Sequence, residues 1–96
     1  MPKVVLASAL TRWLDPAAAG PGEIALDAAG DTLVAVLDAV FAHHPKLRGY
    51  VLDEHGGVRH HVAIFIDGTA IADKHRLDIH VAQSTEIYIL QALSGG

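Results

Sequence analysis

The chain ends in Glu86-Ile87-Tyr88-Ile89-Leu90-Gln91-Ala92-Leu93-Ser94-Gly95-Gly96, where an alternating apolar segment runs directly into two glycines. The alternation predicts a strand over residues 86–93, because successive side chains of a strand point to opposite faces of a sheet. Ser94, Gly95 and Gly96 are then expected to form a flexible tail. A chain end without Cβ atoms can enter a narrow channel, and its α-carboxylate is ionised at neutral pH. Gly96 is therefore the candidate reactive residue, and the alternative is a frayed end without function.

Three further segments have the composition and alternation of strands. They are predicted over residues 3–10, 23–28 and 60–66. Residues 15–22 are dense in proline and glycine, which predicts a loop between the first two strands and makes them a hairpin with a long connection. The third segment ends in the turn dipeptide Asp67-Gly68 and is expected to be a central strand.

One helix is predicted over residues 32–43. Its apolar side chains recur at helical spacing, namely Leu33, Val36, Leu37, Val40 and Phe41. Asp31 or Thr32 is expected to cap the first turn, and Pro45 prevents the helix from continuing. Residues 46–59 show little periodicity and are predicted to form an irregular excursion with one hairpin-like turn. Residues 70–78 are predicted to be a mixed polar segment.

This order of elements predicts the fold class. Two strands, one helix and two further strands within 96 residues are typical of an α+β domain with one helix packed across a single sheet. A hydrophobic fraction of 51% with 19% charged residues indicates a folded globular chain. The length corresponds to one domain.

The composition also argues against several classes of function. The formal net charge is -4, the acidic residues are scattered and no basic stripe is present, so a nucleic-acid partner is not expected. Cysteine is absent, which excludes disulfides, thiolate metal sites and a cysteine nucleophile. No apolar run approaches the length of about eighteen residues that a membrane span requires, so we expect no membrane partner and a cytoplasmic location.

Seven histidines raise the question of a metal site, chiefly at His43-His44 and His60-His61. Adjacent residues of a strand point to opposite faces, so His60 and His61 are not expected to ligate one ion together. His43 and His44 lie at the predicted end of the helix, where an imidazolium interacts favourably with the helix dipole. We therefore expect surface histidines and no metal site.

The chain resembles the ubiquitin-like β-grasp sulfur carriers of the MoaD/ThiS type, which include the small subunit of molybdopterin synthase and the thiazole-forming and cysteine-forming carrier proteins. The matching segments are residues 30–33 at the start of the helix, residues 62–68 with their terminal Asp-Gly turn, and residues 86–96. The resemblance implies a ubiquitin-like β-grasp fold over residues 1–93, with a mixed four- to five-stranded sheet and one main helix. Gln91 stands where the family often has proline. The long stretch from Pro45 to His60 is similar to that of the cysteine-forming carriers.

The resemblance also implies a mechanism. An E1-like adenylating enzyme would bind the domain and use Mg-ATP to adenylate the Gly96 carboxylate. A persulfide of a sulfurtransferase would then displace AMP, leaving a thiocarboxylate that donates sulfur to a biosynthetic enzyme. The pathway, which supplies cysteine, molybdopterin, thiazole or another thio-metabolite, stays open. The chain itself would be a monomeric carrier with no bound cofactor, not an enzyme. The alternatives are a modifier conjugated to lysines and a non-covalent binding module.

The predicted strand faces supply a candidate partner surface. Five apolar side chains fall opposite the positions assigned to the helix-facing core, namely Ala63, Phe65, Tyr88, Leu90 and Ala92. An apolar patch on an open sheet face is typical of a protein interface. The alternative is that residues 46–59 cover part of this patch.

Overall fold

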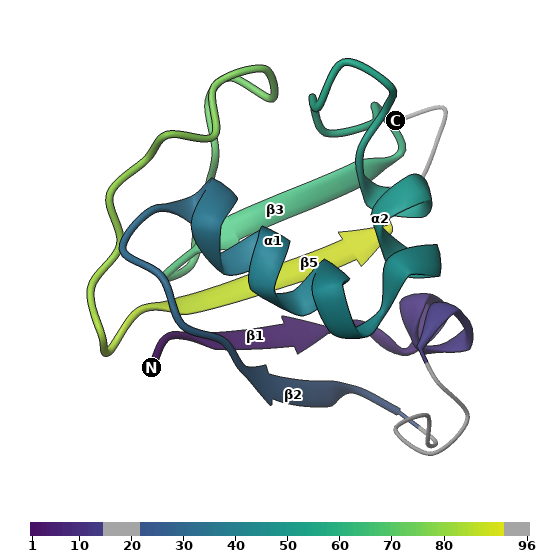
Figure 1. Cartoon of the computed structure of the whole chain (residues 1–96), viewed down its shortest axis with the longest axis horizontal. Coiled ribbons are helices and arrows are strands. Elements are labelled where there is room, and N and C mark those ends of the chain that lie inside the picture. The colour runs from purple at the N-terminus through teal and green to yellow at the C-terminus, as the bar shows by residue number, and fades with distance from the viewer. Residues whose placement is uncertain (15–21, 92–96) are drawn as a thin grey trace.

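The protein folds as a five-stranded mixed sheet with two helices on one face. The computed structural model describes residues 1–14 and 22–91. The strand order is β2-β1-β5-β3-β4, with β1 and β5 parallel and the other pairs antiparallel. The strands are β1 (Lys3–Leu6), β2 (Ile24–Asp27), β3 (Val62–Ile66), β4 (Thr69–Ala70) and β5 (Glu86–Gln91). Figure 1 shows β5 in the interior of the sheet, between β1 and β3. The predicted α+β class and mixed sheet are confirmed.

The predicted first strand was too long at its C-terminal end. β1 ends at Leu6, and a short 3-10 helix, η1 (Ser8–Trp13), follows. The Leu10 amide donates to the Ala7 carbonyl at 2.9 Å, and the Thr11 hydroxyl donates to the Ser8 carbonyl at 2.9 Å. Val4 and Leu6 are buried from β1, whereas Leu10 is buried from the 3-10 helix.

The main helix, α1 (Leu33–His43), confirms the predicted helix, and its five predicted apolar residues are all buried. Thr32 is the cap, because its hydroxyl oxygen accepts a hydrogen bond from the Ala35 amide at 3.2 Å. This contact satisfies one of the free amides of the first turn.

Residues 46–59 contain a helix that the sequence interpretation missed. Helix α2 (Pro45–Val51) begins with proline at its first turn, where the missing N–H costs no hydrogen bond. Leu47 and Val51, four residues apart, are fully buried. The predicted hairpin-like turn is confirmed by the antiparallel bridge between Leu52 and Val58.

The β3–β4 hairpin corrects two further boundaries. β3 begins at Val62 and not at residue 60, and β4 ends at Ala70, the first residue of the segment predicted to be mixed and polar. Asp67 and Gly68 connect the two strands with φ values of 48° and 86°. Positive φ at both central residues is characteristic of tight hairpin turns.

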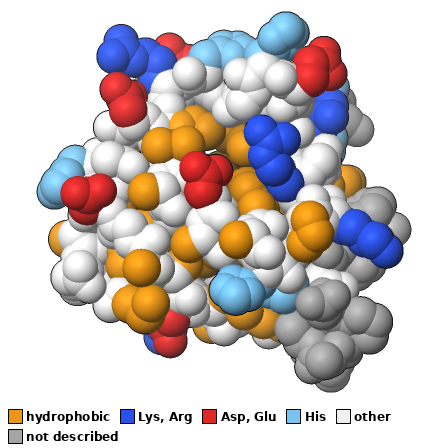
Figure 2. All heavy atoms as spheres, in the orientation of Figure 1, with side chains coloured by type: hydrophobic (Ala, Val, Ile, Leu, Met, Phe, Trp, Pro, Cys, Tyr) orange, Lys and Arg blue, Asp and Glu red, His pale blue; other side chains and the backbone are white. Residues whose placement is uncertain are grey.

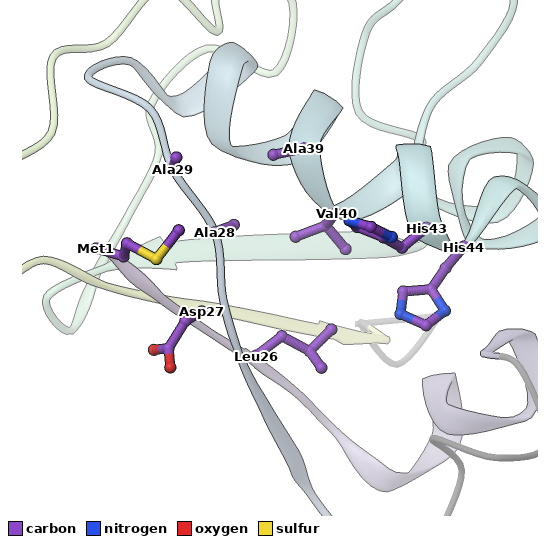
Figure 3. Close-up of a pocket in the computed structure, with 9 residues that line it drawn as sticks. All are labelled: Met1, Leu26, Asp27, Ala28, Ala29, Ala39, Val40, His43 and His44. Atoms are coloured by element: carbon purple, nitrogen blue, oxygen red, sulfur yellow. The ribbon is translucent and has the colours of Figure 1, made fainter.

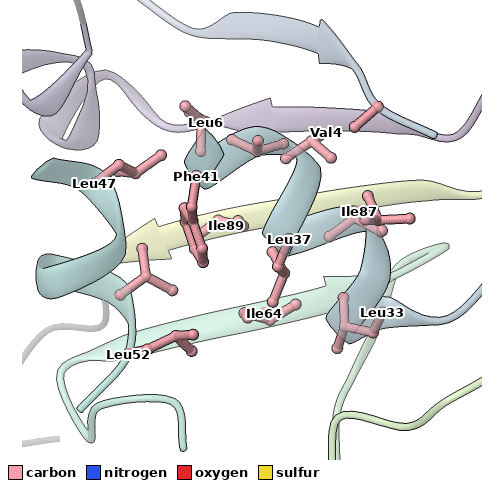
Figure 4. Close-up of a cluster of buried hydrophobic side chains, with 14 of the residues drawn as sticks. Val4, Leu6, Leu33, Leu37, Phe41, Leu47, Leu52, Ile64, Ile87 and Ile89 are labelled. Carbon is pink, nitrogen blue, oxygen red and sulfur yellow. The ribbon is translucent and has the colours of Figure 1, made fainter. Parts of the chain in front are cut away.

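The hydrophobic core lies between the sheet and the two helices (Figure 4). The sheet contributes alternate residues of its inner strands, and α1 contributes its apolar stripe. Among the fully buried side chains are Val4, Leu6, Leu33, Leu37, Leu47, Ile64, Ile87 and Ile89. The opposite face of the sheet carries no helix in the described residues, so it is the open face of the molecule.

Candidate functional site at the open sheet face and the end of strand β5

The open face is crossed by one row of side chains that spans all five strands. The strand registers pair Ala25 with Val5, Val5 with Tyr88, Tyr88 with Phe65, and Phe65 with Ala70. Paired residues of neighbouring strands point to the same face, so this row is apolar apart from the tyrosine hydroxyl. Val5 is only 9% exposed although it lies outside the core cluster. Val5 is therefore nearly buried although it faces away from the helices.

Tyr88 connects two distant strands across this row. Its hydroxyl donates a hydrogen bond to the carboxylate of Glu23, the residue that precedes β2. That hydrogen bond raises the pKa of Tyr88, and burial and the negative charge of Glu23 act in the same direction. Since β1 lies between β5 and β2, the tyrosine side chain reaches over β1 near Val5. The contact joins residues 65 positions apart, and alternation alone does not predict it.

The apolar part of the open face continues toward the end of β5. Leu90 pairs with Ala63, and Gln91, the last described residue, pairs with Val62. At the other end of the face the neighbours are charged, because Lys3 pairs with Asp27 and with Glu86. The apolar surface therefore runs toward the C-terminal segment.

The structure places four of the predicted interface residues together. Ala63, Phe65, Tyr88 and Leu90 are half-buried neighbours on β3 and β5. Helix α2 lies on the same side of the sheet as α1, so this part of the excursion does not cover them (Figure 1). The remaining predicted site residues, Ala92, Ser94, Gly95 and Gly96, lie outside the described residues.

The helix-covered face has a different character. Figure 2 shows apolar patches on this face that are interrupted by acidic, basic and histidine side chains. A groove of about 290 Å³ lies between α1 and the segment that follows β2 (Figure 3). Ala28, Ala29 and Ala39 leave this space open because their side chains are small. The groove was not predicted, since it depends on which small residues face one another.

Within residues 1–14 and 22–91, no three His, Cys, Asp or Glu side chains are arranged to hold a metal ion. The His60 and His61 ring centroids are 5.7 Å apart with the rings nearly perpendicular, and the His61 and Tyr50 rings form a T-shaped pair with centroids 4.9 Å apart. No helix in the described residues has the length and apolar character needed to cross a bilayer.

Comparisons with known proteins identify the family. The model of the ThiS family matches residues 13–96. No curated protein matches the chain. Among solved structures, SAMP1 from Haloferax volcanii is 27% identical with a TM-score of 0.70, and the match covers 99% of this chain and 98% of that chain.

Two structures of CysO share the fold at lower identity. CysO from Mycobacterium tuberculosis is 20% identical with a TM-score of 0.73, covering 94% of this chain and 99% of that one. The match to the BexX/CysO complex of Amycolatopsis orientalis is 16% identical with a TM-score of 0.73, covering 97% and 99%. Together with the sheet and helix arrangement, the family match establishes that this chain belongs to the ThiS family of ubiquitin-like β-grasp proteins and is a sulfur carrier or ubiquitin-like modifier.

Proposed function

We propose that this protein is a sulfur carrier whose Gly96 carboxylate is activated and then converted to a thiocarboxylate. The family match is the observation that carries this proposal. The direction of the apolar open face supports it, since Leu90 and Ala63 lie at the end of the sheet that leads to the C-terminal residues. We take residues 1–93 as the carrier domain and residues 94–96 as its reactive tail.

Three reactions build the thiocarboxylate. In the first, a Gly96 carboxylate oxygen attacks the α-phosphorus of ATP, pyrophosphate leaves and an acyl-adenylate forms. In the second, the terminal sulfur of a sulfurtransferase persulfide attacks the acyl carbon and AMP leaves. The resulting acyl disulfide is cleaved by a further thiol, which releases the thiocarboxylate and leaves a disulfide on the partner side. The carrier has no cysteine, so the persulfide and the thiol belong to its partners.

The partner enzymes supply the catalytic groups. An E1-like enzyme binds ATP and magnesium, and a sulfur-accepting enzyme consumes the thiocarboxylate, so this chain acts as a carrier. We place these reactions in the cytoplasm. The half-buried patch of Ala63, Phe65, Tyr88 and Leu90 is the surface that these enzymes would recognise. The CysO structure that contains BexX supports the idea that proteins of this fold assemble with other proteins.

A second candidate function is conjugation to other proteins. SAMP1, whose structure is described as that of a small archaeal modifier protein, is 25% to 27% identical to this chain. A modifier would use the same acyl-adenylate, but a lysine amine would attack the acyl carbon in place of sulfur. The two functions therefore share the first reaction and differ in the acceptor.

ATP–pyrophosphate exchange with the activating enzyme tests the shared first reaction. We expect wild-type protein to support exchange and a variant without Gly96 to support none, although both fold. Equal exchange by the two proteins would contradict the assignment of Gly96.

A further inference from the structure

A second surface near the end of β5 is formed by the loop that leads into β3 and the loop that follows β4. A hollow of about 320 Å³ lies between these loops. Its charged and titratable lining residues are Asp53, Arg59, His60, His61, Lys74 and His75. We call this site the cationic hollow, and the proposed carrier chemistry does not use it.

The two cations of the hollow are held in place by backbone carbonyls. The Lys74 ammonium donates to the carbonyls of Arg59 at 3.2 Å and His60 at 3.1 Å. The Nε of Arg59 donates to the Gly49 carbonyl at 2.9 Å. In the described part of the chain, no carboxylate oxygen lies within 4.0 Å of either cation. These hydrogen bonds orient the two side chains, which reduces the entropic cost of ordering them when an anion binds. No ion pair in the described residues neutralises their charges.

Asp53 is the acidic residue of the lining, and its oxygen Oδ1 is occupied by the chain itself. It accepts hydrogen bonds from the amides of His55 at 2.8 Å and Gly57 at 3.0 Å. These bonds are the main cause of the lowered pKa of Asp53, so the carboxylate stays charged at neutral pH. The negative charge of Asp53 opposes anion binding. Removing this charge should therefore raise the affinity for an anion, whereas removing a cation should lower it.

The hollow lies beside the end of the sheet from which the chain continues to Gly96. His60 and His61 immediately precede Val62, and Val62 is the register partner of Gln91. A protein that encloses the C-terminal residues approaches this end of the sheet.

The charge distribution selects an acidic partner surface at this place. Residues 46–76 carry five Lys or Arg side chains against four Asp or Glu, whereas the rest of the chain carries two against seven. The net charge is therefore +1 over residues 46–76 and -5 over the rest of the chain, which favours contact of an acidic partner with the first part over the second.

We propose that the cationic hollow binds an acidic segment, with adjacent Asp or Glu side chains, of the protein that receives the C-terminal tail. This inference rests on the proposed carrier function for the identity of the partner. The preference of the hollow for an anion rests on the positions of Arg59 and Lys74 alone.

The proposal is tested by titrating the whole protein with a blocked tetraglutamate peptide at low salt. Amide NMR chemical shifts of the protein report the binding. We expect the shifts to centre on residues 58–61 and 74–75. Lys74→Gln or Arg59→Gln should each weaken the peptide about two- to fivefold, the usual size of one exposed charge pair. Lys46→Gln makes the same charge change on the exposed start of α2 and should leave the affinity unchanged.

Two further measurements test the proposal even if a cation variant does not fold. Asp53→Asn keeps an oxygen acceptor for the two amides, removes the opposing charge, and should tighten binding. A matched tetraglutamine peptide should not bind. Equal weakening by Lys46→Gln, or shifts produced by inorganic phosphate but not by the peptide, would overturn the proposal. The assay needs no activating enzyme, so its failure is distinguishable from a loss of pyrophosphate exchange.

Discussion

The hydroxyl of Tyr88 on β5 donates a hydrogen bond to the carboxylate of Glu23, so the last strand of the sheet in sequence is connected to the residue that precedes β2. Val5 on β1 is the register partner of Tyr88 and is 9% exposed, on a face that carries no helix in residues 1–14 and 22–91. The contact therefore links β5 to the start of β2 across β1, which lies between them.

The first prediction concerns the titration of Tyr88. The hydrogen bond to Glu23 raises the folded-state pKa of Tyr88 above the ordinary value of 10.0. Its contribution to stability is therefore present below the unfolded-state pKa and is lost as the pH rises through the folded-state pKa. In an ultraviolet pH titration, with the Tyr88 signal assigned by comparison with Tyr88→Phe, Tyr88 should ionise at a pH above its ordinary pKa of 10.0. The Glu23→Gln substitution should move this ionisation toward lower pH. An identical Tyr88 titration in Glu23→Gln would show that the contact does not hold the proton.

Two neighbouring residues of β3 test the division between core and partner surface. Ile64 is 1% exposed and faces the helices, whereas Phe65 is half-buried on the open face. Ile64→Asp should unfold the domain, because an unpaired buried carboxylate costs a large part of a stability of about 5–15 kcal/mol. Phe65→Asp should keep the fold, at a cost of about 1 kcal/mol, and raise the KM for the carrier in the activation reaction. Circular dichroism measures the fold, and activation of Phe65→Asp at the wild-type KM would contradict the proposed interface.

Two glycine substitutions are expected to change stability in opposite directions. Gly30 has a φ of +152°, and a Cβ there would lie 2.8 Å from the backbone nitrogen of Val36. Gly30→Ala should therefore lower the free energy of unfolding by about 1–3 kcal/mol. Gly49 lies within α2 with nothing within 4 Å of its added Cβ, so Gly49→Ala should raise it by about 0.5–1 kcal/mol. Urea unfolding measures both, and equal effects would refute the close approach at Gly30.

The loop that lines the cationic hollow should respond to acid. Hydrogen bonds from Gly57 and His55 lower the folded-state pKa of Asp53 below its ordinary value of 3.8. The stability from the Asp53 charge is therefore present above the unfolded-state pKa and is lost as the pH falls through the folded-state pKa. Thermal unfolding of wild type and Asp53→Asn should differ at neutral pH, and the difference should close in strong acid. If wild type and Asp53→Asn differed in thermal stability by the same amount at all pH values, the charge of Asp53 would not be the cause of the difference.

The sequence predicts the elements with strong periodicity and misses those with little. The inner-facing Ile87 and Ile89 and the stripe of α1 are defined by spacing alone. Helix α2 has only two buried apolar residues, and it begins with a proline that ends the preceding helix. β4 is two residues long, which is too short for a pattern.

The candidate site is predictable in part for the same reason. Alternation assigns Phe65 and Tyr88 to the open face, but it does not give the register that makes them neighbours or brings Tyr88 to Glu23. The cationic hollow combines residues about fifteen positions apart through contacts of the Lys74 side chain with backbone carbonyls. Such contacts follow from the tertiary fold and leave no sequence pattern.

The intact mass of the protein, purified after co-expression with an E1-like adenylating enzyme and a sulfurtransferase, tests the carrier function most directly. A thiocarboxylate at Gly96 adds about 16 Da, the difference between sulfur and oxygen, and we expect this gain in wild type but not in a variant without Gly96. Larger adducts on lysines of other proteins would support the modifier function in its place. An unchanged mass in the presence of an active adenylating enzyme and a sulfur donor would contradict covalent activation of Gly96.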